Sequence, residues 1–287
     1  MFTRPFRYER AERFADACEL IRSLGEGAKV IAGGQSLLPM INLGLVQPDV
    51  VVDVSRVAEG RDIWRADGYL TAGALVTHAR LASDVLAREV QPLLGEAARR
   101  IGNARVRNRG TLGGSLAHGD PAAELPLVMM ALGATYEVTN GQSIRMVKAE
   151  DFPVTFLTTQ LESDELIVSV QVPMLGPGWG WSFQEVSRRD GDFAVVAVAA
   201  LVRSAGGLIV EARVAAGGVS DKPVRLGDIE AALSGASPVQ IADRVGPING
   251  IRPVTDAGAS AEYRKHLSRV LVVRALEEAS RRSGEAA

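Results

Sequence analysis

The sequence has few of the residues that hold metals or form cross-links. It contains one cysteine, Cys18, which excludes an intramolecular disulfide, a CxxC redox pair and a cysteine-held iron–sulfur cluster or zinc finger within this chain. The three histidines, His78, His118 and His266, lie far apart in the sequence. We therefore expect no metal site and assign no residue to metal binding.

Long apolar runs and an excess of charge of one sign are also lacking. The longest apolar stretches, 125–130 and 193–202, are shorter than the roughly 20 residues that cross a bilayer. The 32 basic and 34 acidic residues give a net charge of -2, which provides no strong field for nucleic acid or an anionic membrane. No apolar run resembles a secretory signal near the N-terminus. We expect a cytoplasmic protein without an integral membrane segment, which meets any membrane through a partner.

The length and periodicity indicate an α+β chain of about two domains, since 287 residues exceed one typical domain. Gly176-Pro177-Gly178 is the best candidate linker. Before it, we expect helices at 14–24, 37–43, 77–88, 92–100 and 121–132, strands at 29–32, 50–54, 62–65, 69–73, 135–139, 143–148 and 166–172, and a glycine- and arginine-rich loop at 102–119. After it, we expect strands at 179–183, 193–202 and 208–215, and helices at 225–233, 238–244 and 261–282.

Two similar glycine segments are the most informative feature. Ala32-Gly33-Gly34-Gln35-Ser36-Leu37 resembles Leu112-Gly113-Gly114-Ser115-Leu116 in having paired glycines, then small polar residues, then leucine. Adjacent glycines allow positive φ and close approach of a ligand, and successive N–H groups can form an anion-binding nest. Together with the hydroxyls of Ser36, Thr111 and Ser115, the two segments could hold a diphosphate from both sides. Glycine pairs also serve as plain turns, and that interpretation stays open.

Other nucleotide-binding motifs are absent or ambiguous. No GxGxxG lies in a strand–helix context and no GxxxxGK[ST] occurs, so neither a Rossmann site nor a P-loop is supported. A local basic cluster contacts a partner or a phosphate, or is simply solvated surface; its members are Arg99, Arg100, Arg105, Arg107 and Arg109. No acid–base pair or activated nucleophile stands out, so no catalytic residue is assigned.

At the glycine segments the chain resembles the FAD-binding medium subunits of the molybdenum hydroxylases. This family includes the flavoprotein subunits of carbon monoxide, quinoline and nicotine dehydrogenases and the flavin domain of xanthine dehydrogenase. The resemblance extends along nearly the whole chain, and the segments that carry it are Ala32 to Pro39, Ile101-Gly102, Arg107 to Leu116, Asp120 to Pro126, Ser187 to Arg189, Asp192 to Ala194, Ala215 to Val219 and Tyr263-Arg264.

The resemblance implies a fold and a set of FAD contacts. The implied architecture is a two-subdomain FAD-binding fold of the vanillyl-alcohol oxidase type, residues 1–56 and 57–175, followed by a C-terminal α+β domain at 176–287 that covers the flavin. Noncovalent FAD would be held by Ala32, Gly33, Gly34, Gln35, Ser36, Leu37, Ile101, Thr111, Gly113, Gly114, Ser115, Glu124, Leu166, Ile167 and Phe193. Gln184 and Glu185 stand where several relatives have a lysine.

The resemblance also implies a role in electron transfer. A small partner subunit with [2Fe–2S] clusters would deliver electrons that a large molybdenum-pterin subunit takes from substrate, and this chain would pass them to an external acceptor. A dimer of heterotrimers is the expected assembly. The alternatives are a self-contained flavin-dependent oxidoreductase of the same fold, and a non-catalytic module whose glycine segments are architectural.

Overall fold

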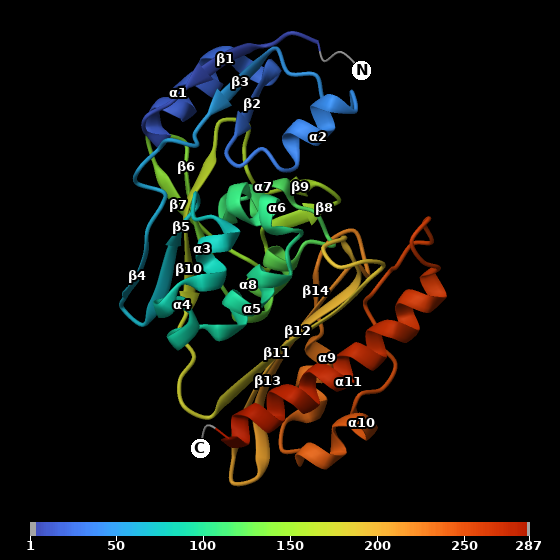
Figure 1. Ribbon diagram of the computed structural model, residues 1–287. Helices are drawn as coiled ribbons and strands as arrows, with labels where there is room; N and C mark the ends of the chain where they lie inside the picture. The colour runs from blue at the N-terminus through green and yellow to red at the C-terminus, as the bar shows by residue number, and fades with distance from the viewer. Residues whose placement is uncertain (1–3, 286–287) are drawn as a thin grey trace.

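The first unit of the computed structural model, which describes residues 4–285, is a small parallel sheet. Its three strands lie in the order β1-β3-β2, with β1 at Arg7–Arg10, β2 at Ala28–Ile31 and β3 at Val50–Asp53. The helices are α1 (Phe14–Leu24), the 3-10 turn η1 (Gly25–Gly27) and α2 (Leu37–Asn42). The buried face of α1 packs on β2 and β3, and the whole unit forms one end of the molecule (Figure 1). Strand β1 was not expected from the sequence.

The second unit is a five-stranded antiparallel sheet with helices beside it. The strand order is β4-β5-β10-β6-β7, and the tight hairpin predicted at Asn140-Gly141 joins the last two. The strands are β4 (Ile63–Ala66), β5 (Tyr69–Gly73), β6 (Thr135–Thr139), β7 (Ile144–Lys148) and β10 (Leu166–Pro173), with the separate pair β8 (Pro153–Thr155) and β9 (Thr158–Thr159). The helices are α3 (His78–Ser83), α4 (Val85–Val90), α5 (Pro92–Arg100), α6 (Ala104–Arg109), α7 (Leu112–His118) and α8 (Glu124–Leu132).

Two predictions for this unit are wrong, and N-caps explain both. The helix expected at 77–88 is two helices, because Asp84 is extended and its carboxylate accepts the Ala87 N–H to begin α4. The loop expected at 102–119 contains α6 and α7. The Asn103 side chain caps α6, and the Thr111 hydroxyl caps α7. Side-chain caps stabilise short helices in a stretch whose glycine content favours a loop.

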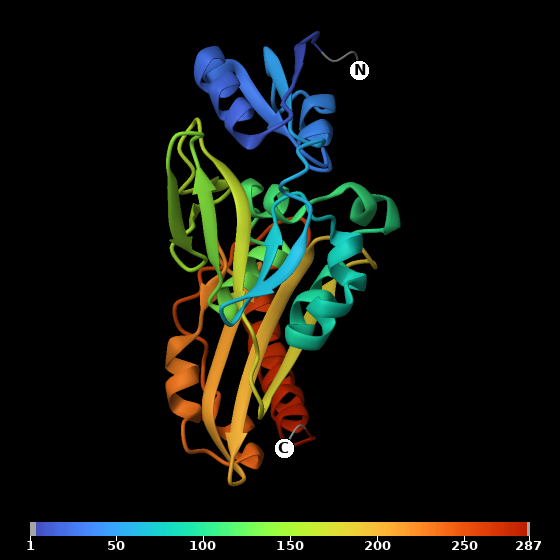
Figure 2. The same cartoon turned by 90° about the vertical axis from the view of Figure 1, so that its left-hand side faces the viewer.

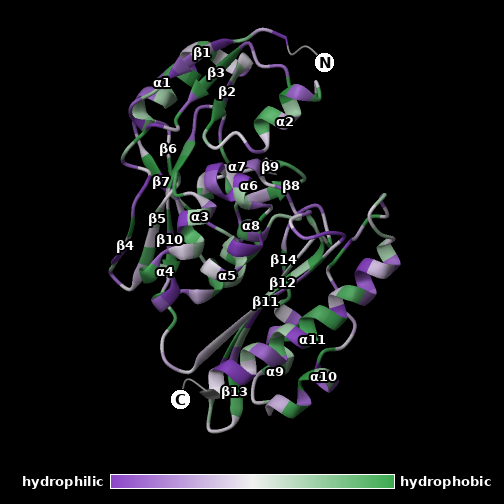
Figure 3. Ribbon diagram, in the orientation of Figure 1, coloured by the Kyte–Doolittle hydropathy of each residue, from purple (hydrophilic) through white to green (hydrophobic). Residues whose placement is uncertain are grey.

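The third unit is an antiparallel sheet with one long covering helix. Its strands follow the order β11 (Trp179–Ser187), β12 (Ala194–Ala205), β13 (Leu208–Gly217) and β14 (Val224–Arg225). The helices are α9 (Gly227–Leu233), the 3-10 turn η2 (Pro238–Gln240), α10 (Ile241–Arg244) and α11 (Ala261–Glu285). Helix α11 runs along β11 and β12 (Figure 2), and it alternates hydrophobic and hydrophilic segments (Figure 3).

Strand β12 is buried on both faces, which explains its continuous apolar run. Ala197, Ala199 and Leu201 belong to the core shared with the second unit, where α8 packs on β12 and β13. Val196, Val198 and the other alternate residues belong to a second core under α11. Side chains alternate between faces along a strand, so a two-sided strand is apolar at every position.

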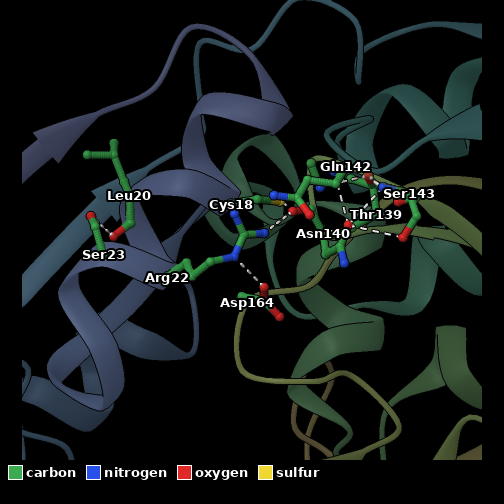
Figure 4. A network of polar contacts seen from close by, with 10 residues as sticks. Cys18, Leu20, Arg22, Ser23, Thr139, Asn140, Gln142, Ser143 and Asp164 are labelled. Atoms are coloured by element: carbon green, nitrogen blue, oxygen red, sulfur yellow. Dashed lines mark hydrogen bonds and ion pairs between the residues drawn. The ribbon is translucent and has the colours of Figure 1, made fainter.

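A polar network joins α1 to the β6–β7 hairpin and fixes the first unit on the second (Figure 4). The Arg22 guanidinium donates to Asp164 Oδ2 at 2.9 Å and to the carbonyl of Asn140 at 2.5 Å. The Cys18 thiol, buried on the inner face of α1 as its position predicted, donates to the carbonyl of Thr139 at 3.5 Å. These contacts tie α1 of the first unit to the hairpin and to the loop before β10 in the second.

Within residues 4–285, none of the helices combines the length and the apolar character needed to cross a membrane.

Candidate functional site

A cavity of about 640 Å³ lies where the three units meet. Its walls come from the first glycine segment, from residues around the second, from the start of β10 and from the loop before β12. All fifteen residues assigned to FAD from the sequence line it: Ala32, Gly33, Gly34, Gln35, Ser36, Leu37, Ile101, Thr111, Gly113, Gly114, Ser115, Glu124, Leu166, Ile167 and Phe193. The fold therefore brings these distant segments around one space, within the size range of small-molecule sites.

The first glycine segment presents free backbone donors to this cavity. Strand β2 ends at Ile31, Gly34 adopts φ +73°, and α2 begins when the Leu38 N–H donates to the Gly34 carbonyl at 3.1 Å. Among the contacts within residues 4–285, the N–H groups of Gly33 to Ser36 donate to no protein atom. Four successive free N–H groups on a turn are suited to a phosphate, because they satisfy its oxygens without a charged side chain.

The first glycine segment touches the chain just before the second, at Arg109 and Gly110. A Cβ atom on Gly33 would lie 2.1 Å from the carbonyl oxygen of Arg109 and 2.8 Å from the Gly110 Cα. No side chain fits in that space, so glycine at position 33 is what permits the contact. The first and second units thereby form one continuous floor beneath the cavity.

The second glycine segment has already bonded most of its N–H groups. The Gly113 N–H donates to the Ala74 carbonyl at 2.8 Å, and the Ser115 N–H donates to the Thr111 carbonyl at 3.0 Å. The Gly114 N–H donates to Thr111 Oγ1 at 3.2 Å. What remains for a ligand is the Thr111 hydroxyl proton and the Ser115 hydroxyl. The second segment differs from the first in offering side-chain donors rather than backbone donors.

A buried carboxyl group faces the cavity at the N-terminus of α8. Glu124 is 6% exposed. Burial raises its pKa to about 8; a hydrogen bond from its own backbone opposes the rise, and the nearby Glu185 and Asp120 charges add to it. Burial also raises the pKa of Glu185 to about 7, an effect that Arg100 opposes. Both groups therefore hold protons near neutral pH far more readily than exposed glutamates do.

His78 lines the same cavity and was not assigned to it. The sequence allows His78 a place near the flavin and favours a partly buried structural role; in the structure the residue is 4% exposed and its ring lies against Gly110. Burial lowers its pKa to about 4, so the imidazole is neutral. Its Nδ1 atom is buried without a hydrogen-bond partner among residues 4–285. No spacing motif marks this histidine, and only the fold brings it to Gly110.

The third unit closes one rim of the cavity through a single loop. Gly191 adopts φ +81°, and a Cβ atom there would lie 2.9 Å from the carbonyl carbon of Gly102. The loop places Phe193, 64% exposed, at the cavity edge. On other sides the lining includes apolar residues that the sequence did not indicate, namely Met40, Val46, Leu157 and Leu161. Leu157 carries a weak signal in retrospect, since its φ of +51° marks a constrained turn that glycine usually occupies.

Two family profiles cover almost all of this chain. Residues 4–175 match the FAD binding domain in molybdopterin dehydrogenase, and residues 181–279 match the CO dehydrogenase flavoprotein C-terminal domain. This chain belongs to the FAD-binding medium subunits of the molybdenum hydroxylases. The match confirms the family suggested by the glycine segments and makes residues 4–175 a FAD-binding domain.

Individual members of this medium-subunit family are similar along their full lengths. The nicotine 6-hydroxylase medium subunit of Paenarthrobacter nicotinovorans is 38% identical over 281 residues, 96% of this chain and 98% of that one. The carbon monoxide dehydrogenase medium chain of Hydrogenophaga pseudoflava is 32% identical over 277 residues, 96% of each chain.

Solved structures of the family have the same fold. Carbon monoxide dehydrogenase from Hydrogenophaga pseudoflava contains a chain that superposes with a TM-score of 0.94 at 33% identity, covering 98% of this chain and 99% of that chain. Quinoline 2-oxidoreductase from Pseudomonas putida 86 gives 0.91 at 34% identity, covering 98% and 99%. These matches confirm the expected FAD-binding architecture with its C-terminal α+β domain.

The cavity of this medium subunit fits the chemistry of FAD. Free N–H groups at Gly33 to Ser36 suit a diphosphate. A Cβ at Gly33 would break the contact with Arg109 that positions these N–H groups. Apolar walls at Ile101, Leu166 and Ile167 suit flat aromatic rings. Cofactor chemistry also explains why the chain needs no nucleophile of its own.

Proposed function

We propose that this chain holds noncovalent FAD in the 640 Å³ cavity and serves as the electron-transfer flavoprotein of a molybdenum hydroxylase. When bound, FAD accepts electrons and releases them to an external acceptor. The observation that carries the proposal is the meeting of all fifteen sequence-assigned residues around a cavity whose floor has four free N–H groups.

The residues of the chain would act by binding and orienting. Gly33 to Ser36 would donate to the diphosphate, with Thr111 and Ser115 adding hydroxyl donors from the other side. Leu166, Ile167 and Ile101 would pack on the rings, and Phe193 would shield the rim. Glu124 would hold a proton beside the cofactor near neutral pH because of its raised pKa.

The source of the electrons is part of the same proposal. The single cysteine cannot form a cluster, so [2Fe–2S] centres would belong to a small partner subunit and molybdenum-pterin to a large one. The proposal includes a dimer of heterotrimers and a cytoplasmic location. It also includes the division of the chain at about residues 56 and 175, and support for the second boundary is that the family matches are separated at 175–181.

Two measurements test the proposal. The purified chain should take up added FAD and show bands near ~450 nm that acid treatment releases, as expected for a noncovalent flavin. Co-expression with the neighbouring subunits should then yield a complex in which substrate reduces the flavin only when the iron–sulfur subunit is present. A chain that binds FAD but is reduced by substrate alone, and never associates with an iron–sulfur protein, would favour the self-contained oxidoreductase instead.

A further inference from the structure

A second pocket, of about 410 Å³, lies behind the glycine segments. Four arginines line it: Arg56 after β3, Arg61 before β4, Arg80 on α3 and Arg109 at the end of α6. Ser55 and Asn108 add polar groups, and the lining contains no carboxylate. We call this space the arginine pocket. Its members are far apart in the sequence, and only Arg109 belongs to the basic cluster noted at 99–109.

Hydrogen bonds to the backbone hold two of the four guanidinium groups. Arg61 donates to the carbonyl of Ser55, and Arg80 Nη1 donates to the carbonyl of Arg61 at 2.7 Å. Arg56 and Arg109 make no side-chain hydrogen bond or ion pair with residues 4–285. One acid faces the group, since Asp62 lies 3.8 Å from Arg80, but its side chain is 76% exposed.

Four cations against one solvated carboxylate leave the arginine pocket with uncompensated positive charge. The rest of the chain is slightly acidic, so this charge is a local feature and not part of a general basic surface. Guanidinium groups bind phosphate and carboxylate oxygens through paired, charge-assisted hydrogen bonds. An anion bound here would also relieve the repulsion among the four arginines.

The arginine pocket shares a wall with the cofactor cavity. Ala32, Leu75 and Thr111 line both spaces. Arg109 joins them most directly, because it lines the arginine pocket and its carbonyl oxygen lies close to Gly33 of the first glycine segment. A ligand that orders Arg109 would therefore act on its contact with the first glycine segment.

We propose that the arginine pocket is a second binding site, for a multivalent oxyanion, and that its occupancy tightens FAD binding through the shared wall. The binding part stands on the lining of the pocket alone. The coupling part rests on the proposed FAD function, and coupling between two sites must be reciprocal. The ligand chemistry is that of a diphosphate or a polycarboxylate, free in solution.

The binding part is tested by calorimetric titration of the FAD-saturated full-length chain with inorganic pyrophosphate and, separately, with citrate. Ionic strength is held constant with NaCl, because exposed charges are screened by salt. We expect saturable binding of at least one probe, weakened tenfold or more in the double variant Arg56→Gln/Arg109→Gln. Arg65→Gln, an exposed arginine on β4 outside both pockets, should bind within twofold of wild type.

The two probes separate the sources of the anion. Tighter binding of pyrophosphate assigns the pocket to phosphate compounds, and tighter binding of citrate assigns it to carboxylates. Either result supports the proposal if the double variant loses binding of the same probe. Absence of saturable binding by both probes overturns it, as does equal binding by the double variant at an unchanged melting temperature.

The coupling part is tested by measuring FAD affinity with and without saturating probe. We expect at least a threefold tighter FAD affinity with the probe in wild type and no change in the double variant. Competition at the glycine segments would instead weaken FAD in both proteins and would overturn the coupling. A chain that binds no FAD refutes the proposed function; the same titrations of the FAD-free wild type and double variant then decide the arginine pocket.

Discussion

The two glycine segments have similar sequences, but their backbone N–H groups are hydrogen-bonded differently. In the first, the N–H groups of Gly33 to Ser36 are free within the described residues and face the cavity. In the second, Gly113, Gly114 and Ser115 donate to Ala74 and Thr111. The backbone of the first segment is therefore free to hold a ligand, whereas the backbone of the second is used to hold its own helix and its contact with Ala74. A paired-glycine motif alone does not specify which of these roles a segment has.

The largest expected effect is at Gly33. In Gly33→Ala the new Cβ would lie 2.1 Å from the Arg109 carbonyl oxygen, so the first glycine segment and the chain at Arg109 must move apart. We expect a loss of about 3 kcal/mol in the free energy of unfolding, at the upper end for overpacking, and FAD affinity at least roughly a hundredfold weaker, since the floor of the site is displaced. Chemical denaturation and FAD titration measure the two quantities. Gly176→Ala is the matched control, because no atom lies within 4 Å of its Cβ.

Gly113→Ala tests whether the second glycine segment supports the fold or binds FAD directly. Its Cβ would meet Ala74 Cβ at 2.6 Å and the Ala74 carbonyl oxygen at 3.0 Å, and no atom of the first segment is among its nearest neighbours. We expect a loss of about 2 kcal/mol in the free energy of unfolding, but less than a tenfold change in FAD affinity of the folded protein. Equal losses of FAD affinity in Gly33→Ala and Gly113→Ala would show that both segments bind directly.

On the side of the second glycine segment, the cavity contains a group that makes the free energy of unfolding depend on pH. Glu124, which follows the second segment, has a pKa raised to about 8 against an ordinary value of 4.5. Between those values the folded chain binds more protons than the unfolded chain, so the free energy of unfolding falls as pH rises. In the FAD-free chain, Glu124→Gln should remove on the order of 1–2 kcal/mol of that fall between pH 5 and 8.

The control for the pH series is Glu26→Gln, at an exposed glutamate in η1. Denaturation at several pH values should give the same slope for Glu26→Gln as for wild type. Glu185 contributes to the fall in the same direction, so Glu124→Gln reduces the slope without abolishing it. A Glu124→Gln slope identical to that of wild type contradicts the burial argument.

The smallest expected effects are at two hydroxyl groups, one in the first glycine segment and one directly before the second. Thr111→Val removes the acceptor of the Gly114 N–H and should cost about 1 kcal/mol of unfolding free energy, as for other lost N-caps. It also removes the hydroxyl donor proposed for the diphosphate, so its FAD affinity should fall about fivefold as well. Ser36→Ala removes a hydroxyl that makes no hydrogen bond within residues 4–285, so stability should not change. Its FAD affinity should fall about fivefold, the equivalent of one hydrogen bond. Melting curves and FAD titrations of both variants distinguish the two roles.

Much of this fold could be predicted from local patterns. The strands at 28–31 and 50–53, the hairpin at Asn140-Gly141 and the long terminal helix follow from periodicity and turn chemistry. Helices α6 and α7 could not, because glycine and arginine dominate their composition. The signal that was present is the pair of capping residues, Asn103 and Thr111, each followed by a short helix.

The residues of the candidate site also fall into those that the sequence could assign and those that it could not. Its motif-bearing residues could be assigned through resemblance, because glycines and small polar residues recur there in a fixed order. Leu157 and Leu161 could not be assigned, because apolar residues without a motif are brought to the cavity only by tertiary packing. The arginine pocket shows the same limit, since the cluster evident in sequence at 99–109 shares only Arg109 with the cluster that forms in space.

Strand β12 has a consequence for the modularity of the chain. From Val196 onward its residues alternate: Ala197, Ala199 and Leu201 complete the interior of the FAD-binding region, and Val196, Val198, Ala200 and Val202 complete the interior beneath α11. A slip of one residue in its pairing would exchange the two sets and disrupt both interiors together. The gap between the two family matches at 175–181 therefore does not separate two independent cores, and we expect the two regions to unfold together.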